Sequence, residues 1–83
     1  MHNRRFNPVL VTSPVRSRDD LYTALANVLY PACRPAPTNL DGLADMLRES
    51  RVRRVIASHW ELNDDDTRQL SRVFKDMGVE LMR

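Results

Sequence analysis

Asp41 and Asp45 are the two residues whose type and spacing point most directly to a function. They lie four positions apart in a segment whose leucines recur at intervals of three and four residues, as in an amphipathic α-helix. Side chains four apart share one face of a helix, so both carboxylates should point away from the leucine stripe. Fixed carboxylates of this kind can bind basic groups of a partner at close range. In the alternative interpretation the face is only solvated, and Asp45 pairs with Arg48.

The pattern predicts that this helix spans residues 38–50. Thr38 or Asn39 can cap its start, and Asp41 then lies in the first turn, where the helix dipole favours an anion. Gly42, between the two aspartates, costs the helix about 0.5–1 kcal/mol relative to alanine. Two like charges four residues apart cost roughly 0.2–0.5 kcal/mol more. The predicted face is therefore acidic, crowded with like charge and suited to a basic partner.

The composition is that of one small domain over residues 1–83, with residues 1–7 as a flexible basic tail. Apolar residues make up 42% and aromatic residues 6%, so we expect a modest aliphatic core. The formal net charge is +2, and the excess of positive charge lies in residues 1–37. Cys33 is the single cysteine, which excludes an internal disulfide and is typical of a reducing cytoplasm. The sequence shows no apolar segment long enough for a signal peptide or a membrane span, so we expect a soluble cytoplasmic protein.

Short β-branched runs alternate with helical patterns along the chain. Helical connections between short strands favour a parallel sheet. We therefore predict an α/β fold in which a three-stranded parallel sheet is flanked by three helices, in the order β-α-α-β-α-β. The segment at 31–38 contains three prolines, so it should be stiff and extended, and it cannot continue either neighbouring helix. The expected elements are a strand at 9–12, a helix capped by Ser17 that ends near Tyr30, the helix at 38–50, a strand at 55–57, a helix capped by Asn63 that ends before Gly78, and a strand at 79–82.

Three segments resemble the barstar family, which are small intracellular inhibitors of barnase-type ribonucleases. The middle segment is the most specific, because Tyr30-Pro31 followed by Asn-Leu-Asp-Gly-Leu-Ala-Asp-Met-Leu at 39–47 resembles the family's loop and second helix. Residues 16–25 resemble the first helix, and residues 60–76 resemble the end of the second strand and the last helix. The family's fold agrees with the order of elements predicted above. The resemblance implies a protein inhibitor, an immunity partner of a nuclease, and not an enzyme.

The resemblance also implies inhibition by charge mimicry. Asp45 takes the place of the family's aspartate that sits where substrate phosphate would sit, among the catalytic arginine and histidine of the ribonuclease. Asp41 is the acidic neighbour one turn earlier, Asn39 shapes the junction of loop and helix, and Asp76 matches an acid of the last helix. A fixed carboxylate in a basic pocket forms charge-assisted hydrogen bonds and steers association. The residues expected to contact the partner are Arg34, Thr38, Asn39, Asp41, Gly42, Ala44, Asp45 and Asp76.

The chain departs from the family pattern at this same surface. Ala44 stands where barstar has tryptophan, and the loop before the second helix is two residues longer and carries Cys33 and Arg34. Beside a basic active site, Arg34 would be repelled unless it meets an acid of the partner. The chain is also basic overall, whereas barstar is acidic. A second hypothesis is therefore a barstar-like fold that binds a different toxin or nuclease.

A cluster of arginines motivates a rival function of another class. A basic stripe formed by the tail and two connectors can bind RNA or DNA through phosphates. No recognition helix or aromatic RNA-binding pattern accompanies the stripe, which makes direct nucleic-acid binding the less favoured hypothesis. Its arginines are Arg51, Arg53 and Arg54, with Arg4, Arg5, Arg16 and Arg18.

No pattern in the sequence indicates catalysis, a metal site or a cofactor site. Cys33 and His59 lack a recognisable third group to orient them as nucleophile and base. The three aspartates at 64–66 lack the spacing and the glycine of an EF-hand, and acids in a first turn favour the helix dipole. Trp60 follows an apolar strand, so we expect it in the core or at its rim. We expect neither a metal nor a cofactor.

Overall fold

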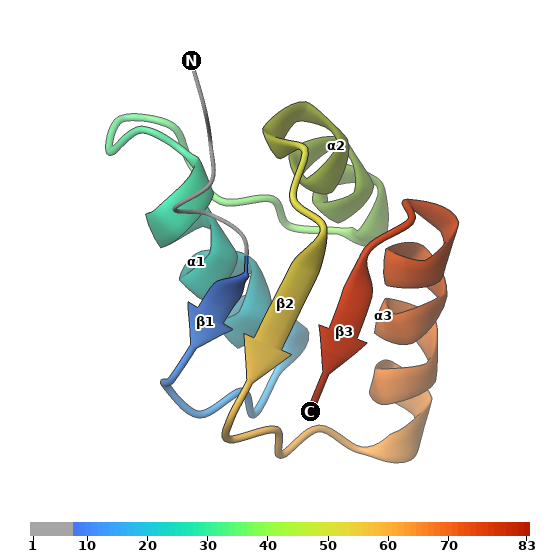
Figure 1. The fold of residues 1–83 in the computed structure, drawn as a ribbon. Helices are drawn as coiled ribbons and strands as arrows, with labels where there is room; N and C mark the ends of the chain where they lie inside the picture. The colour runs from blue at the N-terminus through green and yellow to red at the C-terminus, as the bar shows by residue number, and fades with distance from the viewer. Residues whose placement is uncertain (1–7) are drawn as a thin grey trace.

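The parallel sheet and the order of the elements match the prediction. The computed structural model describes residues 8–83, so the predicted tail at 1–7 lies outside the described residues. Within that range the elements are β1 (Val9–Val11), α1 (Arg18–Leu29), α2 (Leu40–Ser50), β2 (Arg54–Ala57), α3 (Asp64–Asp76) and β3 (Glu80–Met82). The three strands are parallel and lie in the order β1-β2-β3 (Figure 1). The fold is therefore a small α/β domain with two edge strands.

Side-chain alternation in the strands decides which face of the sheet is covered. The first and third residues of β1 are buried, while Leu10 between them is 60% exposed. In β2, Val55 and Ala57 are buried in the same way. Leu10 pairs in register with Ile56, and Ile56 pairs with Met82, which is 44% exposed. In the part of the chain that the structure describes, the helices cover one face of the sheet (Figure 1). Leu10, Ile56 and Met82 form an apolar row across the other face.

Side-chain caps fix the starts of all three described helices. Ser17, Asn39 and Asn63 each accept a hydrogen bond from a backbone N–H three residues on. Asn39 and not Thr38 is the cap of α2, so this helix begins two residues later than predicted. At the start of α1 the Asp20 carboxylate also accepts a hydrogen bond from the Arg16 N–H at 2.9 Å.

Helix α2 ends at Ser50 as predicted, but several other boundaries differ from the prediction by one residue. Helix α1 ends at Leu29, because the residue before Pro31 takes the extended conformation that proline favours. Strand β1 ends at Val11, so Thr12, the last residue of the predicted strand at 9–12, lies outside it. The Val79 N–H donates to the Phe74 carbonyl at 2.8 Å, so this residue closes α3 and is not part of β3. Gly78, as predicted, provides the left-handed turn between them, with a φ of 72°.

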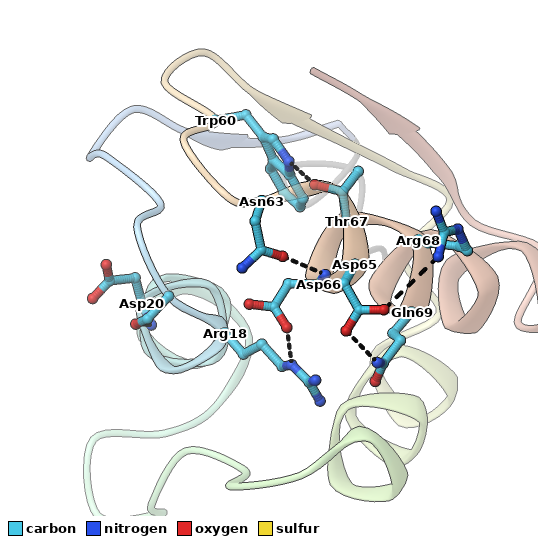
Figure 2. Close-up of polar contacts among 10 residues, drawn as sticks. Arg18, Asp20, Trp60, Asn63, Asp65, Asp66, Thr67, Arg68 and Gln69 are labelled. Carbon is cyan, nitrogen blue, oxygen red and sulfur yellow. Dashed lines mark hydrogen bonds and ion pairs between the residues drawn. The ribbon is translucent and has the colours of Figure 1, made fainter.

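Trp60 lies at the rim of the core, as the sequence predicts. Its side chain is half-buried against the core, and its Nε1–H donates to Thr67 Oγ1 at 2.8 Å (Figure 2). Val15 pairs with Trp60 in a short bridge that continues the sheet beyond β1 and β2. The longest helix in the described range, α3, has 13 residues, and no helix there is long and apolar enough to cross a bilayer.

Candidate functional site

Helix α2 carries the two aspartates on its exposed face. On the opposite face Leu43, Met46 and Leu47 are buried in the core, at 1% exposure or less. Asp41 and Asp45 are both exposed, and Asp41 lies in the first turn of the helix. The helix is thus anchored by its apolar stripe and presents both carboxylates to solvent.

Glu49 extends this pair into an acidic row of three side chains, Asp41, Asp45 and Glu49. Glu49 lies four residues after Asp45, so the spacing that relates the two aspartates also places it on the same face. Burial raises the pKa of Tyr30, the Arg34 guanidinium opposes that shift, and the Glu49 and Asp45 carboxylates add to it. The acidic row therefore runs beside the end of α1 and the loop that follows it. Glu49 was not among the residues predicted to contact a partner, although continuing the same four-residue spacing from Asp45 identifies it.

Arg34 meets an acid of its own chain, so it needs no acid of a partner to be balanced. Its Nη2 donates to Glu49 Oε1 at 2.9 Å, and its guanidinium lies 3.9 Å from the centroid of the Tyr30 ring. The Arg34 N–H also donates to the Pro31 carbonyl at 3.0 Å, so the first half of the loop is a turn and not the extended segment that the prolines predicted. Both charged side chains are about half exposed, so the ion pair contributes roughly 0–1 kcal/mol. Its main effect is to hold the loop against the end of α2.

Asp45 is paired with Arg48, which is the contact that the solvated-face interpretation predicts. Arg48 Nη2 donates to Asp45 Oδ1, and the two side chains remain 65% and 64% exposed. An exposed pair of this kind contributes roughly 0.2–1 kcal/mol, so a cation of a partner can replace Arg48 at little cost. Asp41 has no such pair among the contacts of the described residues.

Gly42 allows the proline-rich loop to lie directly on α2. A Cβ at this position would be 2.7 Å from Pro37 Cβ and 3.3 Å from the oxygen of the capping Asn39 side chain. The proline ring is rigid and cannot move aside as the end of a flexible side chain can. The glycine that the sequence identified as a weak point of the helix is thus the residue that brings loop and helix together.

Helix propensity alone predicts that Gly42→Ala raises the free energy of unfolding by about 1 kcal/mol. Because of the contact with Pro37, we expect that this increase does not occur. Overpacking against Pro37 costs about 1–3 kcal/mol, so we expect a net loss of up to 2 kcal/mol. Urea unfolding followed by circular dichroism measures the change. Ala44→Gly, at a half-buried position of the same helix, is the matched control and should cost the ordinary amount of about 1 kcal/mol. A Gly42→Ala variant that is more stable than wild type would contradict the packing argument.

The remaining predicted contact residues surround the start of α2. Thr38 and Asn39 are exposed, and Ala44 is half-buried between the two aspartates. Asp76 is exposed near the end of α3 and lines a groove of about 420 Å³ whose other lining residues include Leu40. The fold thus brings the acid from the last helix to the beginning of α2. Arg68 and Arg72 line the same groove, so its charge is mixed.

The arginines of the nucleic-acid hypothesis are largely engaged with acids. Arg54 Nε donates to Glu80 at 2.9 Å, and Arg51 takes the left-handed conformation that ends α2. Arg53 is exposed and also has an interaction. Arg4 and Arg5 lie outside the described residues. The other two arginines are paired as well. Arg16 pairs with Glu61 at 3.4 Å. Arg18 pairs with Asp66 at 2.9 Å, as Figure 2 shows.

Cys33 and His59 are not brought together by the fold. Cys33 is exposed in the loop before α2, and His59 follows β2 (Figure 1). These two segments lie at opposite ends of the sheet. Within residues 8–83 no three His, Cys, Asp or Glu side chains are grouped so as to hold a metal ion.

The Tyr22 hydroxyl is the one buried side-chain polar group in the described range without a hydrogen-bond partner. Tyr22 is 2% exposed, and burial raises the pKa of its hydroxyl, while the nearby Arg18 guanidinium opposes that shift. A buried, unsatisfied hydroxyl costs about 1–3 kcal/mol of stability. Asp19 and Asp66 also act on this hydroxyl and raise its pKa further.

Tyr22→Phe should therefore stabilise the protein by about 1 kcal/mol at neutral pH, the opposite of an ordinary core substitution. It should also change the response to alkali. Because the pKa of Tyr22 in the folded protein lies above the ordinary value of about 10, alkali ionises this tyrosine more easily in the unfolded chain. The folding stability that depends on a neutral Tyr22 hydroxyl is therefore complete below pH 10 and is lost as the pH rises through the folded pKa. Urea midpoints measured between pH 7 and pH 11 should fall less steeply for the variant. A variant that is less stable than wild type at pH 7 would indicate a hydrogen bond for this hydroxyl.

No family model, no curated protein and no solved structure matches this chain. The resemblance to the barstar family therefore stays a hypothesis that rests on the residues quoted above.

Proposed function

We propose that this protein is a cytoplasmic, stoichiometric inhibitor of a small basic ribonuclease of the barnase type. The observation that supports the proposal most is the exposure of Asp41 and Asp45 on one face of α2, beside a loop that Gly42 allows to lie against the helix. In this proposal the acidic row and the loop at 31–39 block the nuclease active site.

The physical basis is the basic character of a site that binds RNA phosphates. Asp45 stands in for a phosphate and accepts charge-assisted hydrogen bonds, which are about twice as strong as neutral ones. Asp41 meets a second cation one turn earlier, and Asn39 holds the start of the helix in place through its bond to the Gly42 N–H at 2.8 Å. Asp76 adds negative charge from α3. Because the partner's cation has to replace Arg48 on Asp45, the exposed position of that pair favours the exchange.

The test is a titration of the chain against a purified barnase-type ribonuclease, with RNA hydrolysis and calorimetry as readouts. We expect a 1:1 complex that abolishes hydrolysis and whose association slows when NaCl is raised from 50 to 300 mM. A parallel titration against a single-stranded RNA oligomer is expected to show no binding at the same concentrations. Absence of inhibition at micromolar inhibitor would reject the proposal. RNA binding that Arg53→Ala or Arg54→Ala weakens would favour the rival function.

A second candidate is a different toxin or nuclease that the same surface binds. The position of Arg34 supports it, because this side chain presents a guanidinium stacked on Tyr30 next to the acidic row. Ala44 between the aspartates leaves room for a larger side chain of a partner. Pull-down from the native host, with the Asp41→Ala, Asp45→Ala double variant as the control bait, separates the two candidates. A partner that is retained by wild type, lost on the double variant and lacks ribonuclease activity would support the second.

A further inference from the structure

The apolar row on the open face of the sheet has no element packed on it in the described part of the chain. Leu10, Ile56 and Met82 lie side by side on β1, β2 and β3, because Leu10 pairs in register with Ile56 and Ile56 pairs with Met82. Leu10 is 60% exposed and Met82 is 44% exposed, while Ile56 is half-buried between them. The helices lie on the other face of the sheet (Figure 1).

Two general rules mark this row as a contact surface. All-parallel sheets occur almost only with both faces covered, whereas this parallel sheet is covered on one face. Contiguous apolar side chains on the surface of a small protein are typical of an interaction site. Of the three large apolar side chains that are exposed in the described residues, Leu10 and Met82 lie on this face, and Val28 lies apart on α1. The apolar exposure is thus concentrated where the sheet lacks a cover.

The charges on this face favour a partner surface without net charge. Alternation along the strands places Arg54 and Glu80 beside the row, and these are the charged strand residues on the open face. Arg54 Nε donates to Glu80 Oε1 at 2.9 Å, so the two charges balance each other within one chain. A strongly acidic or basic partner would have to displace that pair and would place charge against apolar side chains. The face therefore matches another apolar surface whose own charges cancel.

A second copy of this chain provides such a surface, because the row is symmetric about its middle residue. Ile56 lies on the central strand, with Leu10 on one side and Met82 on the other. A two-fold axis through Ile56 thus brings apolar side chains onto apolar side chains, as an isologous interface requires. Sheets that pack face to face lie about 10 Å apart, and side chains from both sheets fill that distance.

The ion pair decides the direction of the axis. If the axis ran along the strands, Arg54 would lie opposite Arg54 of the other copy, and like charges face to face are unfavourable. If the axis runs along the apolar row, each of the three apolar side chains meets its own counterpart. The two ion pairs then lie at opposite ends of the interface, where Arg54 faces the polar Ser58 that follows β2 of the other copy. Only the second arrangement suits both the apolar row and the charges.

We propose that this chain forms a symmetric dimer through the open face of its sheet, in which Leu10, Ile56 and Met82 pack on the same residues of the other copy. The face measures about 14 Å across the strands and about 16 Å along them, which is well below the roughly 800 Å² per partner of a standard interface. The dimer is therefore weak, with a dissociation constant of roughly 0.1–1 mM, and the chain is a monomer at micromolar concentration. Because α2 lies on the other face of the sheet, the acidic row stays accessible, and the inference does not depend on the proposed function.

The experiment is sedimentation equilibrium of the full chain from micromolar to millimolar concentration. We expect the average mass to rise from that of one chain toward that of two. Leu10→Lys places two ammonium groups opposite each other and should raise the dissociation constant at least tenfold. Lysine is common on edge strands, so this variant should keep its fold, which circular dichroism checks. Val28→Lys is the matched control, because it replaces a side chain that is 39% exposed on α1, and it should leave the dissociation constant unchanged.

A charge exchange between two variants tests which residues meet. Leu10→Lys and Leu10→Glu should each stay monomeric alone, but their equimolar mixture should associate, because position 10 of one copy meets position 10 of the other. A mixture that stays monomeric would overturn the proposal, as would equal loss of association in Val28→Lys. A wild type that is monomeric at millimolar concentration would also overturn it. If Leu10→Lys then destabilised the fold as strongly as a core substitution, the face would be covered by the chain itself.

Discussion

Asp45→Ala should weaken the complex with a barnase-type ribonuclease by about 2–5 kcal/mol, which is roughly 30-fold to several thousand-fold in the dissociation constant. The loss is large because the nuclease cations that the carboxylate would meet are left buried and unpaired. Asp41→Ala, one turn earlier at the edge of the surface, should cost less. Stopped-flow association and calorimetry at fixed salt measure both effects.

The matched control for this prediction is Arg48→Ala. Removing Arg48 frees the Asp45 carboxylate, so the proposed function predicts unchanged or tighter binding. Because the Asp45–Arg48 pair is exposed, both single variants should keep the urea midpoint of the wild type within about 1 kcal/mol. A dissociation constant for Asp45→Ala within twofold of wild type would mean that this face of α2 is only solvated.

Leu43→Ala should destabilise the protein by about 2–5 kcal/mol, the largest effect on folding that we predict for α2. Leu43 is fully buried on the inner face of the helix, so the substitution leaves a cavity under the acidic row. An 83-residue domain has a total stability of about 4–12 kcal/mol, so the loss is a large part of the whole. Urea unfolding monitored by Trp60 fluorescence and by circular dichroism measures it.

Leu10→Ala is the control for the core substitution. It removes the same atoms from a side chain that is 60% exposed on the open face of the sheet, and it should cost less than 1 kcal/mol. Equal losses for the two variants would show that Leu10 is covered in solution. In the folded fraction, Leu43→Ala should keep the affinity of the wild type for the nuclease, because the surface carboxylates are intact.

The boundaries of the elements follow from signals that the sequence carries locally. Ser17, Asn39 and Asn63 bond to backbone groups three residues away, and Gly78 takes a left-handed conformation that other residues adopt at a cost. Such contacts need only the neighbouring chain, and so the residue types reveal them. The exposed face with Asp41 and Asp45 follows in the same way from helix periodicity.

The parallel sheet also followed from the sequence, although less directly. Helical connections between short strands leave few arrangements other than a parallel one. Residue spacing alone could not reveal which edge strand lies beside which helix. That depends on how the apolar faces of α1, α2 and α3 pack against the sheet together.

The ion pairs that set the charge of the candidate surfaces join residues far apart in sequence. Arg34 with Glu49 and Arg18 with Asp66 are 15 and 48 positions apart, so no local pattern predicts them. The sequence by itself determined the capped helices, the acidic face of α2 and the order of the elements along the chain, because hydrogen bonds between near neighbours and periodic burial act along the chain. Only the tertiary structure decided that Arg34 is balanced by its own chain and that the Tyr22 hydroxyl is buried without a partner. Those outcomes depend on which elements pack side by side, and packing is a property of the whole core.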